Sequence, residues 1–359
     1  MIRKPLPRFL CGALCFLCVF VVSSPAAEPL PNTKPLTEDG DLAAKMVAGI
    51  HKYLDRALAD SPKNREAMWK LDVSSPEAYA KSVAPHRERL RKILGVVDKR
   101  VQPHLEYISG PGESSLIAEI DGCKIHAVRW AVLPGVDAEG LLIEPKGEPR
   151  ANVVAVPHAD QLPEDVAGVG KGDAFGLRLA RHGCRVVIPT LIDRNDTLSG
   201  NPKLGRATHL PHREFVHRMA YEMGRTLTGY EVQKVLAAVD WFQAKNKLPL
   251  GVIGYGDGGM IALYAAALDE RIKACGVAAY FARREGIAAE PIDRNVWGRL
   301  TEFGDAEIAL LIDPHELGGK PSPRQLTLDP GPATKCDPKF WPLWSGPVVG
   351  KGRGGAAPG

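Results

Sequence analysis

The sequence predicts an α/β protein, with an open, doubly wound, mostly parallel sheet that follows a helical N-terminal segment. Short apolar segments that suit strands alternate with amphipathic segments that suit helices between residues 152 and 281. Before them, apolar residues recur with the period of an α-helix. The composition, 45% hydrophobic and 25% charged over 359 residues, is that of an ordinary globular protein. These proportions exclude a wholly disordered chain, a polytopic membrane protein and a fibrous repeat.

Residues 1–27 are expected to be a secretory signal peptide. The segment opens with Arg3, Lys4 and Arg8, continues with an uncharged apolar run of fourteen residues, and closes with small residues at 23–27. A helix needs about 20 apolar residues to span a bilayer, and this run is shorter, so an uncleaved membrane anchor is the weaker alternative. We therefore expect export to the periplasm or the exterior, with no stable membrane span after cleavage.

Cleavage would change the charge and the cysteine content of the chain. The signal segment carries three of the positive charges and no negative one, so a net charge of +4 becomes +1. A nearly neutral net charge gives no electrostatic reason to expect nucleic acid, whose binding needs a clustered basic face, and no such partner is expected. Four cysteines remain, at 123, 184, 275 and 336, and their spacing matches neither a zinc site nor a dense disulfide framework.

The first elements after the signal are predicted to be a linker and two helices. Residues 28–40 are polar and Pro-rich, as in a linker. The helical N-terminal segment, residues 41–103, repeats apolar residues near every fourth position from Leu42 to Leu58. Ser75 followed by Pro76 marks the start of the second helix, because serine is a good N-cap and proline suits the first helical turn.

Residues 104–312 are predicted to form the sheet domain. Apolar and polar residues alternate between 116 and 132 around the turn Asp121-Gly122, and an apolar segment follows at 140–144. This pattern predicts that the domain begins with antiparallel strands. Four further strands are expected at 152–156, 184–188, 250–254 and 272–281, separated by helices at 174–182, 214–245 and 258–268 and by a polar insertion at 193–211. Right-handed crossovers arrange such a succession as an open sheet.

The last segment, residues 313–359, is expected to be poorly ordered. It contains nine prolines and nine glycines, and it has no apolar run long enough for a central strand.

A glycine-rich segment, Gly254-Tyr255-Gly256-Asp257-Gly258-Gly259, lies between a predicted strand and helix. In a nucleophile elbow, Gly254 and Gly258 would flank the central residue, which is Gly256 where a serine is needed. The segment also satisfies a dinucleotide-binding pattern, but the acidic residue expected about 20 positions later is missing. A third interpretation is a tight turn that packs a helix on the sheet without chemistry.

Residues 130–312 resemble the α/β-hydrolase superfamily, in particular exported bacterial proteins similar to dienelactone hydrolases and acetyl xylan esterases. The resemblance depends on the order and spacing of five stretches, at 132–145, 153–160, 177–189, 254–259 and 294–298. It implies descent from carboxylic ester hydrolases, a small-molecule ester or acylated carbohydrate as the partner, and no cofactor. The family's last strands, with their acid and histidine, would have to lie in the tail, so the core is expected to be partial, as in a truncated or frame-shifted copy.

The resemblance also implies an oxyanion hole. One donor would be the backbone N–H of Asp257, and the other would come from the loop after His158, near Ala159 and Asp160. His158 would then orient this loop rather than act as a general base. Gly256 leaves the nucleophile position vacant.

Asp257 could substitute for the missing serine only poorly. An ionised carboxylate about 4 Å from a developing oxyanion, at an effective dielectric near 20, would oppose it by roughly 4 kcal/mol. That cost is about a thousandfold in rate. A protonated Asp257, with its pKa raised by burial, would soften the objection.

His209, His212 and His217 form the other candidate for chemistry. Their spacing, with Asp193 and Asp196 upstream, suits a metal site, whereas loop hydrogen bonds are the simpler interpretation. Three hypotheses follow. The first is a hydrolase-like protein with impaired catalysis, the second a non-catalytic module that binds a carboxylate or an acylated sugar, and the third a metal-assisted hydrolase using these histidines.

The superfamily's strand order also bears on the cysteines. It would separate the strands of Cys184 and Cys275 by two others, or roughly 14 Å. A disulfide needs Cα atoms within about 7 Å, so both thiols are expected to stay reduced and buried.

Overall fold

The computed structural model describes residues 30–34, 36–112, 114–201, 203, 205–312 and 324–329. It divides into two units, residues 1–53 and 54–359, and the sheet lies in the second. The predicted signal peptide and most of the predicted tail fall outside the described residues. No helix within the described part of the chain is long and apolar enough to cross a membrane.

Two helices confirm the predicted helical N-terminal segment. They are α1 (Leu42–Met68) and α2 (Pro76–Ile93). Helix α2 begins as predicted, because the Ser75 side chain accepts a hydrogen bond of 3.1 Å from the backbone N–H of Ala78. Val83 and Leu90 of α2 are fully buried in the core of the second unit.

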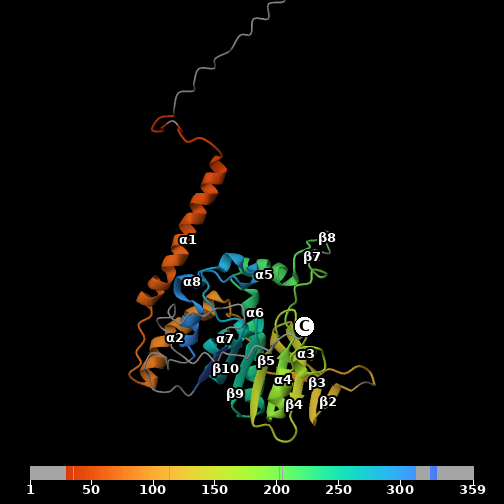
Figure 1. Ribbon diagram of the computed structural model, residues 1–359. Helices are drawn as coiled ribbons and strands as arrows, with labels where there is room; N and C mark the ends of the chain where they lie inside the picture. The colour runs from red at the N-terminus through yellow and green to blue at the C-terminus, as the bar shows by residue number, and fades with distance from the viewer. Residues whose placement is uncertain are drawn as a thin grey trace, which may run out of the picture. The chain divides into compact units, whose positions relative to one another are not determined.

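The described residues form a nine-stranded mixed sheet (Figure 1). Its strands are β1 (Leu105–Tyr107), β2 (Leu116–Ile120), β3 (Cys123–Leu133), β4 (Val136–Glu144), β5 (Ala151–Val156), β6 (Cys184–Pro189), β9 (Leu250–Tyr255), β10 (Ile272–Ala278) and β11 (Gln325–Asp329). Their order is β1-β3-β4-β6-β5-β9-β10-β11, with β2 also paired to β3. Pairing is antiparallel from β1 to β6 and parallel from β6 to β11. The predicted α/β class is confirmed.

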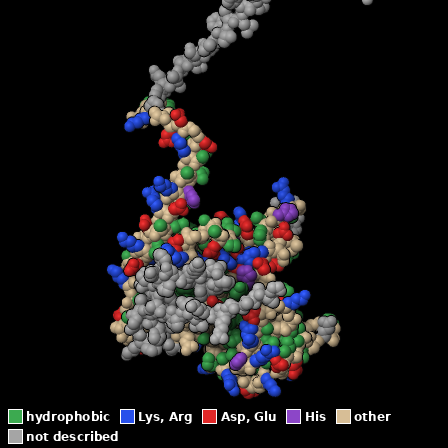
Figure 2. Space-filling view, viewed as in Figure 1, with side chains coloured by type: hydrophobic (Ala, Val, Ile, Leu, Met, Phe, Trp, Pro, Cys, Tyr) green, Lys and Arg blue, Asp and Glu red, His purple; other side chains and the backbone are tan. Residues whose placement is uncertain are grey.

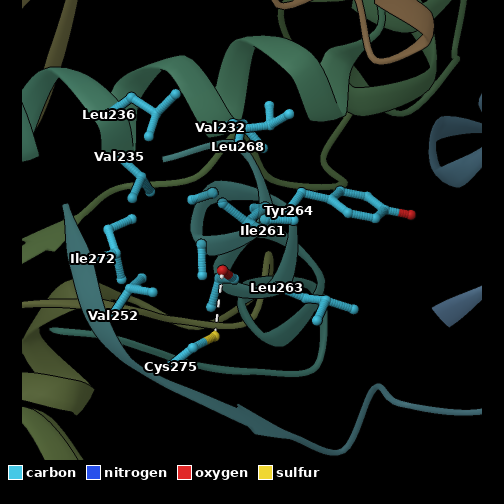
Figure 3. Packing of buried hydrophobic residues seen from close by; sticks show 14 of the residues in the cluster. Val232, Val235, Leu236, Val252, Ile261, Leu263, Tyr264, Leu268, Ile272 and Cys275 are labelled. Atoms are coloured by element: carbon cyan, nitrogen blue, oxygen red, sulfur yellow. Dashed lines mark hydrogen bonds between the residues drawn. The ribbon is translucent and has the colours of Figure 1, made fainter. Parts of the chain in front are cut away.

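Apolar side chains alternate between the two faces of the sheet and build a core on each. On β5, Val154 and Val156 join one core, whereas Val153 and Ala155 join the other. Helices α2, α6 (Leu227–Lys245) and α7 (Asp257–Leu268) contribute to the first core, and the short helices α3 (Pro163–Ala167) and α4 (Phe175–Arg181) to the second. Figure 3 shows α6 and α7 side chains packed against Val252, Ile272 and Cys275.

The predicted helix at 214–245 is two helices. Helix α5 (His212–Glu222) ends before Gly224, whose φ of 67° is left-handed and stops the helix. Thr226 then caps α6 by accepting a hydrogen bond from the N–H of Gly229 at 2.8 Å. The polar insertion holds a small hairpin, β7 (Gly200–Asn201) with β8 (Arg206–Ala207). The remaining elements are η2 (Ile287–Ala289), η3 (Ile292–Arg294), α8 (Arg299–Glu302) and α9 (Asp305–Leu310).

Strand β11 corrects the expectation that the whole of residues 313–359 is poorly ordered, although it is the last strand in the order and not a central one. It pairs in parallel with β10 and places Leu326 and Leu328 against the first core. The Arg324 guanidinium donates to the carbonyl of Ile272 at 2.9 Å at the start of this pairing. The five-residue alternation of β11 escaped notice because prolines and glycines dominate the composition around it.

The sheet order agrees with the prediction for the cysteines in part. Strands β5 and β9 separate β6, which begins at Cys184, from β10, which contains Cys275. Cys123, Cys184 and Cys275 are all free thiols, and Cys275 is buried, whereas Cys184 is only half-buried. Burial raises the pKa of the Cys275 thiol to about 12.

We expect Cys275 to resist iodoacetamide in the folded protein at pH 8. Its thiol is protonated and donates to the carbonyl of Ala262 at 3.5 Å, so labelling should be at least about 100-fold slower than in the unfolded chain. Site-resolved mass spectrometry of unreduced protein, labelled native and in guanidinium chloride, measures this. A lack of labelling at both Cys184 and Cys275 in the unfolded, unreduced chain would contradict the free-thiol assignment.

Candidate functional site

The glycine-rich segment folds as an elbow between β9 and α7. Gly256 stands at the tip with φ 56° and ψ −117°, a conformation that favours glycine. A Cβ on Gly254 would lie 2.0 Å from the carbonyl oxygen of Gly258, and one on Gly258 would lie 2.1 Å from that of Val156. The close approach of β5, β9 and α7 therefore excludes side chains at both flanking positions, as the elbow interpretation predicts.

The imidazole of His158 occupies the place of the nucleophile side chain. A Cβ on Gly256 would lie 2.5 Å from His158 Nδ1. His158 follows the end of β5, and its own backbone N–H is held by the Gln161 side chain at 3.3 Å. The nucleophile position is thus not open space, because a neighbouring ring fills it.

The predicted oxyanion donor is already engaged. The backbone N–H of Asp257 donates to His158 Nδ1 at 3.2 Å. Of the loop residues predicted beside it, Ala159 is buried and Asp160 is exposed, and the carboxylate of Asp160 pairs with Arg194 at 2.8 Å. His158 therefore lies at the elbow itself rather than only orienting the loop.

The Asp257 carboxylate is fully buried and held by basic side chains. Arg194 Nη2 donates to Oδ2 at 2.7 Å, Arg294 Nε donates to Oδ1 at 2.8 Å, and His158 Nδ1 lies 3.2 Å from Oδ2. Burial alone would raise the pKa of Asp257, but the charges of Arg294, Arg213 and Arg194 hold it well below its usual range. Asp257 is therefore ionised, and the idea of a protonated carboxyl is wrong.

Further acidic groups balance these guanidinium groups. Arg294 also donates to Glu290 at 3.2 Å, and Glu290 contacts Arg284 in turn. Arg213, which is fully buried, donates to Asp293 at 2.7 Å. The elbow thus stands within a nearly neutral network of alternating charges.

Sequence reasoning missed the basic half of this site. Arg194 lies between two aspartates in a polar insertion, and Arg213 opens a helix among histidines, so neither stands out from its neighbours. Arg294 is the first residue of the stretch 294–298, one of the five stretches on which the family resemblance depends. This was the one signal in the sequence that could have pointed to a basic residue of the site.

The three histidines do not form a metal site. His209 is exposed with a positive φ of 55°, and its Nδ1 lies 3.6 Å from Asp196. His212 Nδ1 bonds separately to Asp193 at 2.7 Å, and His217 is buried in α5. Within the described ranges no group of three His, Cys, Asp or Glu side chains is placed to hold a metal ion. The structure therefore does not bring the described histidines together as the metal hypothesis requires. His212 makes a loop hydrogen bond, whereas His209 lies beside Asp196 beyond hydrogen-bond distance.

Two exposed aromatic side chains lie close in sequence to residues of the site. Tyr255, at the end of β9, is 49% exposed, and its ring centre lies 6.4 Å from that of His158. Trp297, three residues beyond Arg294, is 72% exposed. Aromatic side chains that are exposed singly are common on protein surfaces, so the nearness of Tyr255 to Gly256 and of Trp297 to Arg294 along the chain is what makes them candidates for ligand contact.

Comparison with known proteins establishes the fold. A candidate acetyl xylan esterase from Bacteroides fragilis is similar with a TM-score of 0.56 and 17% identity, over 82% of this chain and 77% of that chain. An acetyl xylan esterase from Paenibacillus sp. R4 has a TM-score of 0.41 and 14% identity, over 68% and 79% of the two chains. No protein-family model and no curated protein sequence matches.

The mixed sheet, the elbow and the likeness to the Bacteroides fragilis structure together define an α/β-hydrolase fold. The family resemblance in the sequence is confirmed at this level. The identity of 17% carries the fold alone, so activity must be argued from the site.

Proposed function

We propose that this protein binds an acylated carbohydrate at the elbow without hydrolysing it. The proposal rests on the position of His158. Its ring fills the space beside Gly256 where a nucleophile side chain would lie, and its Nδ1 accepts a hydrogen bond from the backbone N–H of Asp257. Serine-type ester hydrolysis needs an attacking oxygen and a free donor for the oxyanion. The elbow offers neither in this arrangement.

Asp257 does not replace the nucleophile in this proposal. Each of its oxygens accepts a hydrogen bond from a guanidinium, and its depressed pKa makes it a weak nucleophile. Its negative charge would also oppose an oxyanion forming nearby. Asp257 is better suited to anchoring Arg194 and Arg294 at the rim of the site.

The charge balance favours a neutral sugar over a carboxylate. Arg194 and Arg294 are offset by Asp257, Asp160 and Glu290, so no surplus positive charge awaits an anion. Acidic and basic side chains are also interspersed over the coloured part of the face drawn in Figure 2. Planar polar groups can bond to sugar hydroxyls, and exposed aromatic rings can pack on the C–H faces of a sugar.

Two indirect observations support the carbohydrate class and the location. The similar structure from Bacteroides fragilis is a candidate acetyl xylan esterase, a class named for an acetylated sugar polymer. Residues 1–27 contain basic residues, then an apolar run, then small residues. This pattern supports export to the compartment where such polymers occur.

We expect no turnover of p-nitrophenyl acetate or acetylated xylo-oligosaccharides above the uncatalysed rate. Gly256→Ser should stay within about twofold of that rate, because the serine would meet His158 and lack a free oxyanion donor. Continuous absorbance and acetate-release assays on the full chain measure this. Wild-type turnover that disappears in Asp257→Asn would instead make the carboxylate the nucleophile.

Saturable binding of an acetylated xylo-oligosaccharide is expected in calorimetry. Trp297→Ala should weaken it about fivefold, the loss of roughly 1 kcal/mol of aromatic packing. Val97→Ala removes an exposed apolar side chain elsewhere and is the matched control. Equal affinity of all three proteins would remove Trp297 from the site, and no binding by any would contradict the proposed function.

A further inference from the structure

His158 touches two different groups of Asp257 with the same ring atom. Its Nδ1 lies 3.2 Å from the backbone nitrogen of Asp257 and 3.2 Å from carboxylate Oδ2. The first group is a hydrogen-bond donor and the second is an acceptor. The His158 side chain is one-third exposed, so solvent protons reach it.

The two protonation states of His158 must use these groups differently. A neutral imidazole with its proton on Nε2 accepts the Asp257 N–H at Nδ1. An imidazolium carries a proton on both nitrogens and accepts nothing, so this bond is lost. The new Nδ1–H is repelled by the Asp257 N–H and attracted by Oδ2, so the imidazolium swings from the backbone toward the carboxylate, and one contact replaces the other.

We propose that His158 gates the backbone N–H of Asp257, covering it when neutral and releasing it to an acyl carbonyl oxygen when protonated. The identity of the ligand rests on the proposed function. The switch needs only one proton from solvent, and no covalent bond forms or breaks. His158 then determines at which pH the site distinguishes an acylated from a deacylated sugar.

The charged groups around His158 set the direction of the switch. Asp257 and Asp160 favour the imidazolium, whereas Arg194 and Arg294 oppose it. Burial, the largest influence, also disfavours the charged ring, and the pKa of His158 is lowered from its ordinary 6.5. The gate is therefore covered at pH 7.5 and opens progressively as the pH falls below 6.5.

The released N–H suits a carbonyl oxygen in particular. It lies in the first turn of α7, where the helix dipole places partial positive charge and the N–H has no partner within the helix. A ligand that needs this donor binds the protonated protein better, so its affinity rises as pH falls, and by reciprocity it raises the pKa of His158. A deacylated sugar has no carbonyl to accept the N–H, so its affinity should be insensitive to the gate.

Nuclear magnetic resonance tests the gate without any ligand. The backbone amide of Asp257 and the ring nitrogens of His158 should titrate together, with one midpoint below pH 6.5. In His158→Gln the Asp257 amide should not shift over this range. An Asp257 amide resonance that is unchanged between pH 7.5 and 5 in the wild type would overturn the proposal.

Calorimetry at pH 7.5 and 5 tests the ligand specificity. The acetylated xylo-oligosaccharide should bind at least about fivefold tighter at pH 5, and its deacetylated form should change less than about twofold. His158→Gln should abolish the difference, whereas His182→Gln, which removes an exposed histidine on the C-cap of α4, should keep it. An equal pH response for both sugars would overturn the gate. Absence of binding at either pH contradicts the proposed function instead, and the amide titration then decides the gate alone.

Discussion

Asp257→Asn is expected to lower the free energy of unfolding by about 3 to 5 kcal/mol at pH 7. The substitution removes the one negative charge that two guanidinium groups share, at 2.7 Å from Arg194 and 2.8 Å from Arg294. Arg194 and Arg294 keep Asp160 and Glu290 as partners, but they lose the fully buried carboxylate that both of them bind, and removing one partner of a buried ion pair carries the stated cost. Asparagine preserves the volume, so the loss reports the charge rather than a cavity.

Urea unfolding followed by circular dichroism measures the effect. Asp137→Asn is the matched control, because Asp137 is exposed on β4 and its loss should change stability by less than about 0.5 kcal/mol. If Asp257→Asn is also within about 1 kcal/mol of the wild type, the carboxylate does not anchor the two arginines.

The same substitution should also change how the free energy of unfolding depends on pH in acid. The folded-state pKa of Asp257 lies well below the ordinary 3.8, so its contribution to stability is fully present above that pH. The contribution is lost as the pH falls from 3.8 through the folded-state pKa. The stability difference between wild type and Asp257→Asn should therefore shrink below about pH 4. At higher pH, protonation of His158, which the Asp257 carboxylate favours, should increase this difference as the pH falls.

Local patterns were sufficient to predict the sheet and the elbow. The strands at 152–156 and 184–188 are short apolar runs that appear as β5 and β6, because both of their faces are buried. The elbow could be located because Gly254 and Gly258 are required by contacts within a few residues or with an adjacent strand. These signals depend on neighbours that the sequence itself places together.

The composition of the site could not be predicted in the same way. Arg194 and Arg294 lie 63 and 37 residues from Asp257, and His158 lies 99 residues from it. No spacing rule connects such positions, because the crossovers of the sheet bring them together. A vacant nucleophile position was therefore predicted where the folded chain has a histidine ring.

The histidine pattern failed for the opposite reason. His209, His212 and His217 are close in sequence, but α5 begins at His212 and leaves His209 outside the helix. Five positions separate His212 from His217 along the helix, so the two side chains do not share one face. Close spacing was thus a weaker guide than the boundary of the helix.

Gly258→Ala is expected to cost more than about 4 kcal/mol and to reduce the soluble yield sharply. The added Cβ would lie 2.1 Å from the carbonyl oxygen of Val156 and 2.4 Å from that of Pro157. Both obstacles are backbone atoms at the end of β5, so no side-chain rotation relieves the contact, and overpacking of a rigid core is costly. Gly286→Ala, in open space, is the matched control and should be close to neutral.

The same contact links the elbow to the gate. Val156 and Pro157 directly precede His158, so any shift of β5 that accommodates the added methyl group also moves the imidazole away from the Asp257 N–H. Residual folded Gly258→Ala should therefore lose the joint titration of His158 and the Asp257 amide. Wild-type stability in Gly258→Ala, measured by urea unfolding, would contradict the close packing of β5 on α7. Because this packing is required by the backbone alone, the elbow can persist in a chain whose central residue carries no nucleophile.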